Sequence, residues 1–301
     1  MLEGIIPIGN WDRDSGNILY LISEVPKEIG VLFAFDQKAH KGFQAANQLA
    51  ESLDKSNCRF VLTDENGPGN VRNAALKEVN GEWISFWDSD DLPNFKNLLE
   101  LTKDLDSLYL SNDILIGRFT KEVILEDESK KVFAKKKANL NYWAAYPGLW
   151  RHIFRWELIK NMSFSPFKWG EDTLFLFDCF NKSNKVLFLT SDLYSYRVIH
   201  TNRYLSKDIS NVKDLEKGLF VMKKEITNSP KGISDFSLKL ADGVFLSVLV
   251  NNLRKNRRIP LIQVRQYIVA RLSGIGIFGI VQVIKSLSIL FFIRLIARHE
   301  K

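Results

Sequence analysis

Three carboxylates follow a single apolar run in this sequence. Residues 83–87 read Trp-Ile-Ser-Phe-Trp, and Asp88, Ser89, Asp90 and Asp91 come directly after them. Carboxylates gathered at the end of a buried strand are unfavourable unless a cation binds there. Their oxygens suit hard divalent ions such as Mg2+ or Mn2+, which take further ligands from water and substrate phosphates. The simpler alternative is a solvated acidic turn in which Asp91 caps the next helix.

The elements that must position these carboxylates are predicted from the apolar pattern. Strands are expected over residues 3–8, 29–35, 59–63 and 83–87, with helical segments between them. Near-continuous apolar strands alternating with amphipathic helices indicate a parallel sheet covered on both faces. Ligands of such open sheets bind at the carboxyl ends of the strands. Polar residues that follow the earlier strands, Asn10, Asp12, Asp36 and 64–69, should therefore lie on the same edge as Asp88.

A glycine-containing loop leads into a helix over residues 66–76. Backbone N–H groups at the helix start, together with Arg72 one turn further, would bind a phosphate or a nucleotide. A second interpretation is the dinucleotide fingerprint of an NAD-dependent oxidoreductase, with Gly67 and Gly69 as its first glycines. Arg72 occupies the position of the third glycine, however, and the loop follows the third strand. A Pro-Gly turn before a helix is the structural alternative.

The middle of the chain predicts a helix near 94–106 and strands near 108–117 and 122–126. A basic segment follows, and it favours a solvated hairpin edge or a phosphate or membrane contact. Residues 150–159 interleave aromatic and basic side chains and are expected to form a helix. Glu171 and Asp172 then open a helix that runs to about Phe180, where acidic residues suit the helix dipole. The basic segment consists of Lys130, Lys131, Lys135, Lys136 and Lys137.

In order and spacing, these segments resemble the inverting nucleotide-sugar glycosyltransferases of family 2. The resemblance implies the GT-A fold, a Rossmann-like open and mostly parallel α/β sheet flanked by helices, here with a helical C-terminal appendage. It implies a catalytic domain over 1–206, and the helical pattern that follows predicts a helical region over 207–301, outside the part of the chain that the resemblance covers. The resemblance is carried by Ile5-Ile6-Pro7, Asp36, Gly69 with Arg72-Asn73, the Asp88–Asp91 run, residues 150–159, Gly170-Glu171-Asp172 and residues 193–197.

The same resemblance implies roles for individual residues. Asp90 would bind the metal, and Asp172, beside Glu171, would be the catalytic base. Donor-binding residues would be Asp36, Gly69, Arg72, Asp88 and Ser89; candidate contacts would be Arg197 and His200 for the diphosphate or metal, and Trp150 and Trp169 for the acceptor. The sequence departs from the family at Asp36-Gln37-Lys38, where paired aspartates are usual, and at Ile8-Gly9-Asn10.

The implied activity is transfer of a sugar, with inversion, from a nucleoside-diphosphate-sugar, by expectation a UDP-sugar, with Mn2+ or Mg2+. The acceptor would be a glycan or lipid-linked glycan in capsule or other surface-polysaccharide synthesis, on the cytoplasmic side of the membrane. Two alternatives stay open besides the oxidoreductase. One is a non-catalytic nucleotide-sugar-binding protein, and the other a nucleic-acid-binding protein that uses 130–137 and 254–258. No nucleic-acid partner is expected.

Composition and the C-terminal third bear on partners. The chain has 301 residues and a formal net charge of +7, which favours anionic partners. Cys58 and Cys179 predict neither a disulfide scaffold nor a zinc site. Helices are expected near 208–226, 234–256, 259–273 and 275–298. Lys285 and Arg294 interrupt the last, so it should not span a membrane. With the basic residues at 254–258 it could lie on an anionic leaflet, or these helices could form a packed subdomain or dimer interface.

Overall fold

The computed structural model describes residues 1–105, 111–124, 129–135, 140–199, 209–228, 232–256 and 261–272. The chain divides into two compact units. The first contains Met1–Ala138, Gly148–Pro166 and Ser183–Ser206; the second contains Asn139–Pro147, Phe167–Lys182 and Lys207–Lys301. The second unit thus includes two segments that the sequence-based division at residue 206 places in the first domain.

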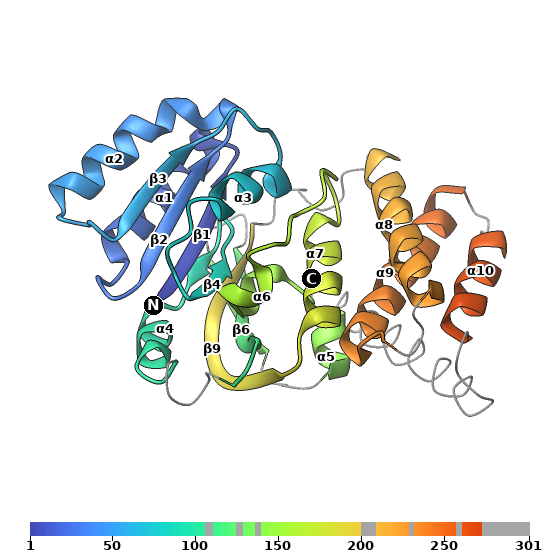
Figure 1. The fold of residues 1–301 in the computed structure, drawn as a ribbon. Coiled ribbons are helices and arrows are strands. Elements are labelled where there is room, and N and C mark those ends of the chain that lie inside the picture. The colour runs from blue at the N-terminus through green and yellow to red at the C-terminus, as the bar shows by residue number, and fades with distance from the viewer. Residues whose placement is uncertain are drawn as a thin grey trace. The chain divides into compact units, whose positions relative to one another are not determined.

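The first unit is built on one mixed sheet. Its N-terminal half consists of four parallel strands in the order β3-β2-β1-β4, as the alternation of apolar runs and helices predicts (Figure 1). Every residue of β1, β2 and β4 is buried, which explains why these strands read as continuous apolar runs. The four strands are β1 (Leu2–Ile8), β2 (Gly30–Phe35), β3 (Cys58–Leu62) and β4 (Trp83–Phe86).

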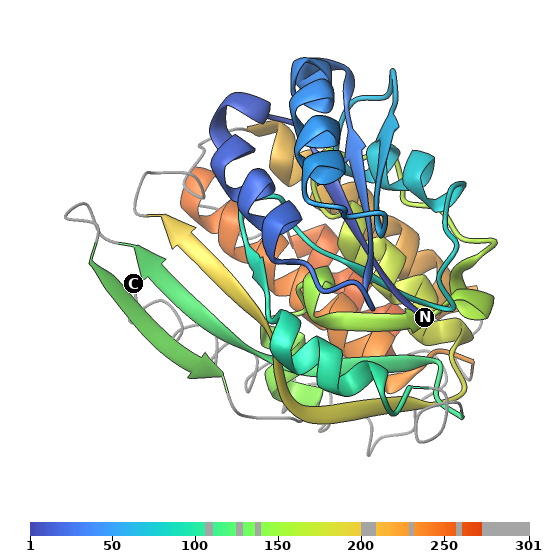
Figure 2. The same cartoon turned by 90° about the vertical axis from the view of Figure 1, so that its left-hand side faces the viewer.

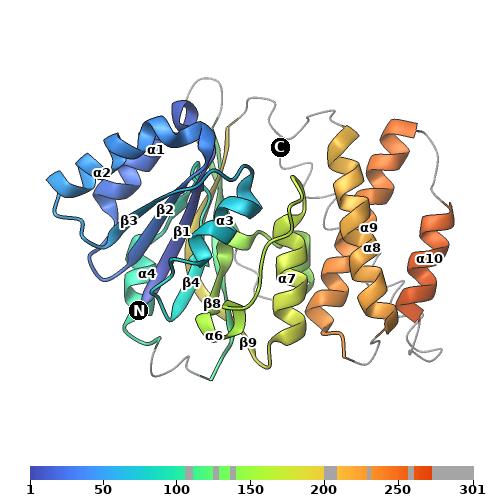
Figure 3. The ribbon, with the colours of Figure 1, turned by 45° about the horizontal axis from the view of Figure 1, so that its top comes forward.

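Helices cover both faces of these strands. Figure 3 shows α1 and α2 on one face of β1 to β3 and α3 on the other. The side chain of Asn10 caps α1 by accepting the N–H of Arg13, and Pro68 starts α3, where its missing N–H costs nothing. The helices and the short 3₁₀ helix after β2 are α1 (Trp11–Glu24), η1 (Gln37–Gly42), α2 (Phe43–Ser52) and α3 (Pro68–Leu76).

The second half of the sheet is mainly antiparallel. Strand β8 joins the edge of β4, β6 follows, and β9 pairs with β6 in parallel and with the short β5 in antiparallel orientation. Figure 2 shows β6, β7 and β9 as long neighbouring strands. The elements are β5 (Leu92–Pro93), α4 (Phe95–Thr102), β6 (Ile114–Ile124), β7 (Lys130–Lys135), β8 (His152–Arg155) and β9 (Val186–Ile199).

Two expectations about this half are wrong. Residues 150–159 are not one helix: they contain the end of the 3₁₀ helix η2 (Leu149–Arg151), strand β8 and the short helix α6 (Trp156–Ile159). Ile153 and Phe154 pair with β4 on one side and β6 on the other, so ladder hydrogen bonds override the helical pattern. Within the described residues 111–124, the two strands expected near 108–117 and 122–126 are a single strand, β6. The remaining parts of both predicted strands lie outside the described residues. The hairpin partner of β6 is the lysine-rich β7, which confirms the predicted hairpin edge.

The second unit is helical. Helix α9 packs against α5, α7 and α8, and rings of Trp143, Phe180 and Phe236 meet in its core with centroids 4.6–5.2 Å apart. The helices predicted near 208–226, 234–256 and 259–273 are confirmed, whereas 275–298 lies outside the described residues. No helix within the described ranges is long and apolar enough to cross a membrane. The helices are α5 (Leu140–Ala145), α7 (Glu171–Lys182), α8 (Ile209–Asn228), α9 (Asp235–Asn256) and α10 (Leu261–Leu272).

Candidate active site

A cleft of about 340 Å3 lies in the first unit, at the carboxyl ends of β1, β2 and β4. This volume is within the range of pockets that bind small molecules. The position is the edge where open α/β sheets bind their ligands, and it confirms the edge predicted from the sequence. Of the residues predicted there, Asp12 does not line the cleft and pairs with Lys41 instead. The cleft is lined by Pro7, Gly9, Asn10, Arg13, Asp36, Gly67, Pro68, Val71, Arg72, Asp88, Ser89 and Asp90.

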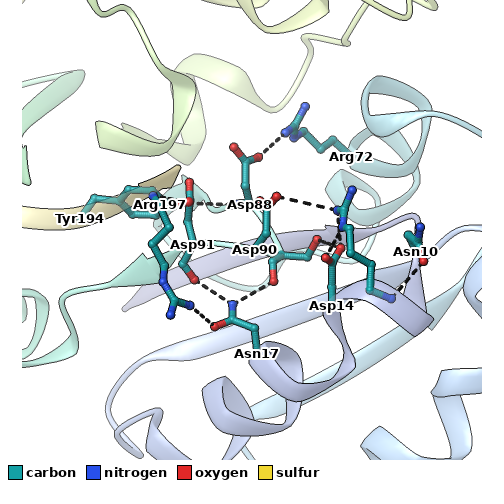
Figure 4. A network of polar contacts seen from close by, with 11 residues as sticks. Asn10, Asp14, Asn17, Arg72, Asp88, Asp90, Asp91, Tyr194 and Arg197 are labelled. Carbon is teal, nitrogen blue, oxygen red and sulfur yellow. Dashed lines mark hydrogen bonds and ion pairs between the residues drawn. The ribbon is translucent and has the colours of Figure 1, made fainter. Parts of the chain in front are cut away.

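Asp88 lies at the end of β4 and pairs with Arg72 of α3. The Arg72 Nη2 atom donates to Asp88 Oδ1 at 3.0 Å. The Arg72 side chain is 6% exposed and lies over the ring of Phe164, with 5.5 Å from the guanidinium carbon to the ring centroid. The Asp88 side chain remains 37% exposed. Arg72 is thus a buried cation that fixes a carboxylate whose oxygens still face the cleft (Figure 4).

Asp90 is the second exposed carboxylate of the run. Its Oδ2 atom lies 3.9 Å from Nη2 of Arg13, and its side chain is 31% exposed. Arg13 is held in turn by Asp14, which is almost completely buried and also accepts a 2.8 Å hydrogen bond from the Ser89 hydroxyl. Ser89 therefore supports the wall of the cleft through its hydroxyl while it lines the cleft between the two aspartates.

Asp91, the third carboxylate, does not line the cleft. Its side chain is buried, and its Oδ1 accepts a 2.7 Å hydrogen bond from the backbone N–H of Arg197 in β9. Burial raises the pKa of Asp91 well above the usual aspartate range, and the charges of Asp88 and Asp90 raise the pKa further, while the Arg197 hydrogen bond opposes them. The run thus divides into two cleft carboxylates and one internal anchor.

Asn17 and Tyr194 fix the backbone of residues 88–91, here called the carboxylate loop. The Asn17 amide donates 2.9 Å hydrogen bonds to the carbonyls of both Ser89 and Asp91, and its oxygen accepts from Nη1 of Arg197. The hydroxyl of Tyr194 accepts from the backbone N–H of Asp88 (Figure 4). These two residues and Arg13 were missed in the sequence. The polar face of the first helix, Asn10, Arg13 and Asn17 at spacings of three and four, was the signal that could have shown two of them.

Asp36 lines the other end of the cleft. It caps η1, because its Oδ1 accepts from the N–H groups of Lys38 and Ala39 at 2.9 and 3.1 Å. A Cβ at Gly9 would lie 3.3 Å from Asp36 Oδ2, so glycine leaves this oxygen room. Gly69, the donor-binding candidate in the glycine loop, is buried in the first turn of α3 and does not line the cleft. Gly67 and Pro68 line it instead.

The predicted base belongs to the second unit. Glu171 and Asp172 are the first residues of α7, after Gly170 with φ +82°. Glu171 is buried. Asp172 is half-buried, and its Oδ1 accepts from the backbone N–H and the hydroxyl of Thr173 at 2.7 and 3.1 Å. These contacts fix the carboxylate at the helix N-terminus, where a negative charge is favoured. The role of Asp172 as base stays a prediction.

The other candidate contacts are placed as follows. Trp150 stacks on the rings of Tyr194 and Tyr196, with centroids 4.8 and 5.4 Å away and interplanar angles of 10° and 9°. Trp169, in the second unit, is 38% exposed. The Arg197 side chain reaches Asn17 and Glu122 and does not line the cleft, and His200 lies outside the described residues. Contacts of Trp150 and Trp169 with an acceptor stay predictions.

The chemistry of the cleft can be judged from its charges. Its lining holds three carboxylates, Asp36, Asp88 and Asp90, against the two guanidinium groups of Arg13 and Arg72. Two partly exposed carboxylates, one residue apart, are oxygen ligands that suit Mg2+ or Mn2+. Among the described residues, no three His, Cys, Asp or Glu side chains form a metal-binding group. Asp88 and Asp90 alone would leave the other positions of such an ion to phosphates and water.

Comparisons with known proteins agree with this geometry. Residues 28–155 match the family described as Glycosyl transferase family 2. Poly(ribitol-phosphate) beta-N-acetylglucosaminyltransferase TarS of Staphylococcus aureus is 27% identical over 177 residues, which cover 56% of this chain and 30% of TarS. The chain thus spans less than a third of that relative's length.

Solved structures share the fold. Residues 1–349 of S. aureus TarS in complex with UDP-GlcNAc superpose with a TM-score of 0.61 at 20% identity, over 90% of this chain and 79% of that one. Mannosyltransferase PcManGT from Pyrobaculum calidifontis, in complex with GDP-Man and Mn2+, gives a TM-score of 0.57 at 13% identity, over 96% and 80% of the two chains. The sequence match places residues 28–155 in glycosyltransferase family 2, and the solved structures show that the chain shares their GT-A fold.

Proposed function

We propose that this domain transfers a sugar from a nucleoside-diphosphate-sugar to a hydroxyl group of a cell-surface polymer. The observation that supports this most is the cleft in which the partly exposed carboxylates of Asp88 and Asp90 pair with Arg72 and Arg13. The UDP-GlcNAc bound by TarS makes a UDP-sugar the first donor to test. The acceptor class in this proposal is a glycan, a polyol phosphate polymer or a lipid-linked glycan, in line with the name of TarS.

A divalent ion, Mn2+ or Mg2+, completes the donor site in this proposal. Asp90 would hold it, with Asp88 as the second carboxylate, and the bound ion would supply stabilisation of the charge on the departing diphosphate. Charge balance supports this arrangement. With three carboxylates against two guanidinium groups the cleft has a net negative charge, which opposes a diphosphate. A divalent cation reverses the sign.

Asp172 is the base in this proposal. Its carboxylate takes the proton of the acceptor hydroxyl while that oxygen forms a bond to the anomeric carbon and the bond to the diphosphate breaks. Attack from the face opposite the leaving group inverts the anomeric configuration, as in inverting glycosidases. The hydrogen bonds from Thr173 fix one oxygen of Asp172 and leave the second to accept the proton.

The test is donor binding and donor hydrolysis across a panel of UDP- and GDP-sugars, with Mn2+, Mg2+ or chelator. Asp90→Ala should abolish metal-dependent binding, and Asp172→Asn should retain binding and lose turnover by at least about a hundredfold. Asp12→Asn is the matched control, since this aspartate pairs with Lys41 near the start of α1 and does not line the cleft. Failure of the wild type to bind any nucleotide sugar with metal present would overturn the proposal.

A second proposal concerns an anionic membrane surface. On α8, Phe220 and Val221 are 61% and 41% exposed, and Lys213, Lys217 and Lys224 are exposed on the same side of the helix. Apolar side chains beside lysines suit the interface of an anionic leaflet, where peripheral binding would bring the domain to a lipid-linked acceptor. Co-sedimentation with vesicles containing phosphatidylglycerol should fall in Phe220→Ser/Val221→Ser and stay unchanged in the control Leu53→Ser. Equal binding of neutral and anionic vesicles would contradict the proposal.

A further inference from the structure

Arg13 is held in place by a carboxylate that has no access to solvent. Its Nε and Nη2 atoms pair with the two oxygens of Asp14, whose side chain is 1% exposed. Adjacent residues on a helix do not normally face one another, so this bidentate pair is formed in the first turn by a specific orientation of both side chains. The Ser89 hydroxyl donates to Asp14 as well. The guanidinium group is therefore positioned before any ligand binds.

The same guanidinium group is also presented to the cleft. The Arg13 side chain is 40% exposed and lines the cleft, and Nη2 lies 3.9 Å from Oδ2 of Asp90. It also lies at the N-terminus of α1, which adds partial positive charge. A cation is thus fixed beside the carboxylate that would bind the metal. A metal ion held by Asp90 and the guanidinium group of Arg13 would repel each other at this distance, unless an anion with several oxygens lies between them.

We infer that Arg13 binds the diphosphate of the donor beside the metal, and that Asp14 and Ser89 position it for this contact. The inference rests on the proposed function, because it takes a nucleoside diphosphate as the ligand of the cleft. Guanidinium groups bind phosphate oxygens with two parallel hydrogen bonds, and a guanidinium group already held in place loses little freedom on binding. One consequence is specific: the protein retains a preference for UDP over uridine when the metal is removed.

The competing explanation is that Arg13 only neutralises the buried Asp14. The two explanations differ in what Arg13→Gln does to a folded protein. A counter-ion role lowers the melting temperature and leaves the affinity per folded molecule unchanged. A diphosphate role lowers the affinity for UDP and leaves that for uridine unchanged. The double variant Arg13→Gln/Asp14→Asn removes both charges together, so that no buried carboxylate is left without its partner, and keeps the test valid if the single variant unfolds.

The experiment is calorimetric titration of wild type and variants with UDP and uridine, in Mn2+ and in chelator. In chelator, Arg13→Gln and the double variant should lose at least about tenfold in UDP affinity, with uridine affinity unchanged; Arg13→Lys, which keeps the charge, should lose less. Lys41→Gln, with the same change in net charge, is the control, since Lys41 pairs with Asp12 and does not line the cleft.

The outcomes separate this inference from the proposed function. If wild type binds UDP with Mn2+ and the Arg13 variants bind it equally well in both conditions, Arg13 is only the partner of Asp14 and the inference is wrong. If Lys41→Gln weakens UDP binding as much as Arg13→Gln, the effect is general electrostatics and the inference is again wrong. If wild type binds neither UDP nor GDP, with or without Mn2+, the proposed function itself fails. If it binds GDP in place of UDP, the same variants are titrated with GDP and guanosine, and the same outcomes decide the inference.

Discussion

The Tyr194 hydroxyl accepts a hydrogen bond of 2.9 Å from the backbone N–H of Asp88. The ring of Tyr194 is buried and stacked on Trp150, which also meets the edge of Phe119. A Cβ at Gly148 would lie 2.4 Å from the Trp150 indole, so only glycine allows this ring position. The stack of Tyr194 in β9 on Trp150 in η2 thus fixes the position of the Asp88 backbone in the carboxylate loop. Burial, with the charges of Asp91 and Asp88 next, raises the pKa of Tyr194, so the hydroxyl stays neutral.

Tyr194→Phe should weaken both the donor site and the fold. The variant keeps the stacked ring and loses the acceptor of the Asp88 N–H, which costs about 1 kcal/mol of folding free energy. Displacement of Asp88 should lower affinity for the donor about five- to tenfold. Tyr196→Phe is the control, because this ring also stacks on Trp150, whereas the Asp88 N–H donates to the hydroxyl of Tyr194. Donor titration and urea unfolding of both variants make the comparison, and equal donor affinity for the two would refute this role.

Asn17→Ala should destabilise the first unit by roughly 2–3 kcal/mol. Asn17 makes three hydrogen bonds, to Ser89, Asp91 and Arg197, and each is worth about 0.5–1.5 kcal/mol. Asn47→Ala is matched in residue type and also lies in a helix, and within the described part of the chain its side chain donates only to Glu51, one turn away, at 2.7 Å. That variant should change stability by less than about 0.5 kcal/mol. Urea denaturation measures both, and similar losses would show that the loop does not depend on Asn17.

Much of the cleft in the first unit could be predicted from the sequence, because the residues that line it directly follow strands whose apolar pattern is clear. The four apolar runs are the four parallel strands, and the residues that follow them, Asp36 and Asp88, meet in the cleft. The prediction was weaker wherever a contact joins segments distant in sequence. Arg197 binds Asp91 across 106 positions and Asn17 across 180, and no local spacing indicates such pairs.

Residues 150–159 show how tertiary contacts override a local pattern. Aromatic and basic residues alternate there at spacings that favour an amphipathic helix, yet Ile153 and Phe154 complete the sheet between β4 and β6. The gain comes from ladder hydrogen bonds to two neighbours, which the sequence of this segment alone does not contain. Similarly, nothing in the run Asp88–Asp91 says that Asp91 turns inward, since that depends on the Arg197 N–H of β9.

Gly67→Ala should destabilise the protein through backbone conformation alone. Gly67 has φ +88° and ψ 150°, and a Cβ added there would meet nothing within 4 Å. This region is almost restricted to glycine, so alanine should cost about 1–3 kcal/mol. Gly16→Ala is the control: its Cβ also meets nothing, but it lies inside α1, where alanine should stabilise by about 0.5–1 kcal/mol. Opposite signs of the two changes in unfolding free energy are expected, and equal signs would contradict the assigned backbone.

Asp242→Ala should destabilise the second unit by about 3–5 kcal/mol, because it leaves a buried guanidinium group without its carboxylate. Asp242 is fully buried in α9, and it accepts hydrogen bonds from Nε and Nη2 of Arg271 at 3.0 and 3.2 Å and from the Tyr267 hydroxyl at 2.6 Å. Asp235→Ala, on the exposed first turn of α9, should cost less than about 1 kcal/mol. The double variant Asp242→Leu/Arg271→Met should recover much of the loss in urea denaturation; no recovery would argue against the buried pair.

His152 should make stability depend on pH below neutrality. Its ring is fully buried in the sheet, and burial, followed by the charge of Arg151, lowers its pKa from 6.5 to about 3. The native state therefore keeps this ring neutral, while the unfolded chain takes up a proton as the pH falls through 6.5. Protons bind preferentially to the unfolded state between pH 6.5 and 3, so stability decreases across that window as the pH falls. Between pH 7 and pH 5 the loss is about 2 kcal/mol.

The variant His152→Phe isolates the contribution of this histidine to the pH dependence of stability, because it keeps a ring beside Phe154 and removes the titrating group. The variant should be less stable at pH 7, because the contact of Nδ1 with the Leu149 carbonyl at 3.2 Å is lost. Its stability should nevertheless change by about 2 kcal/mol less than that of wild type between pH 7 and pH 5, since all other groups titrate alike in both proteins. Parallel urea titrations at pH 5, 6 and 7 measure this difference. Identical slopes would mean that the native ring accepts a proton near its ordinary pKa, and therefore that β8 does not seal His152 within the sheet.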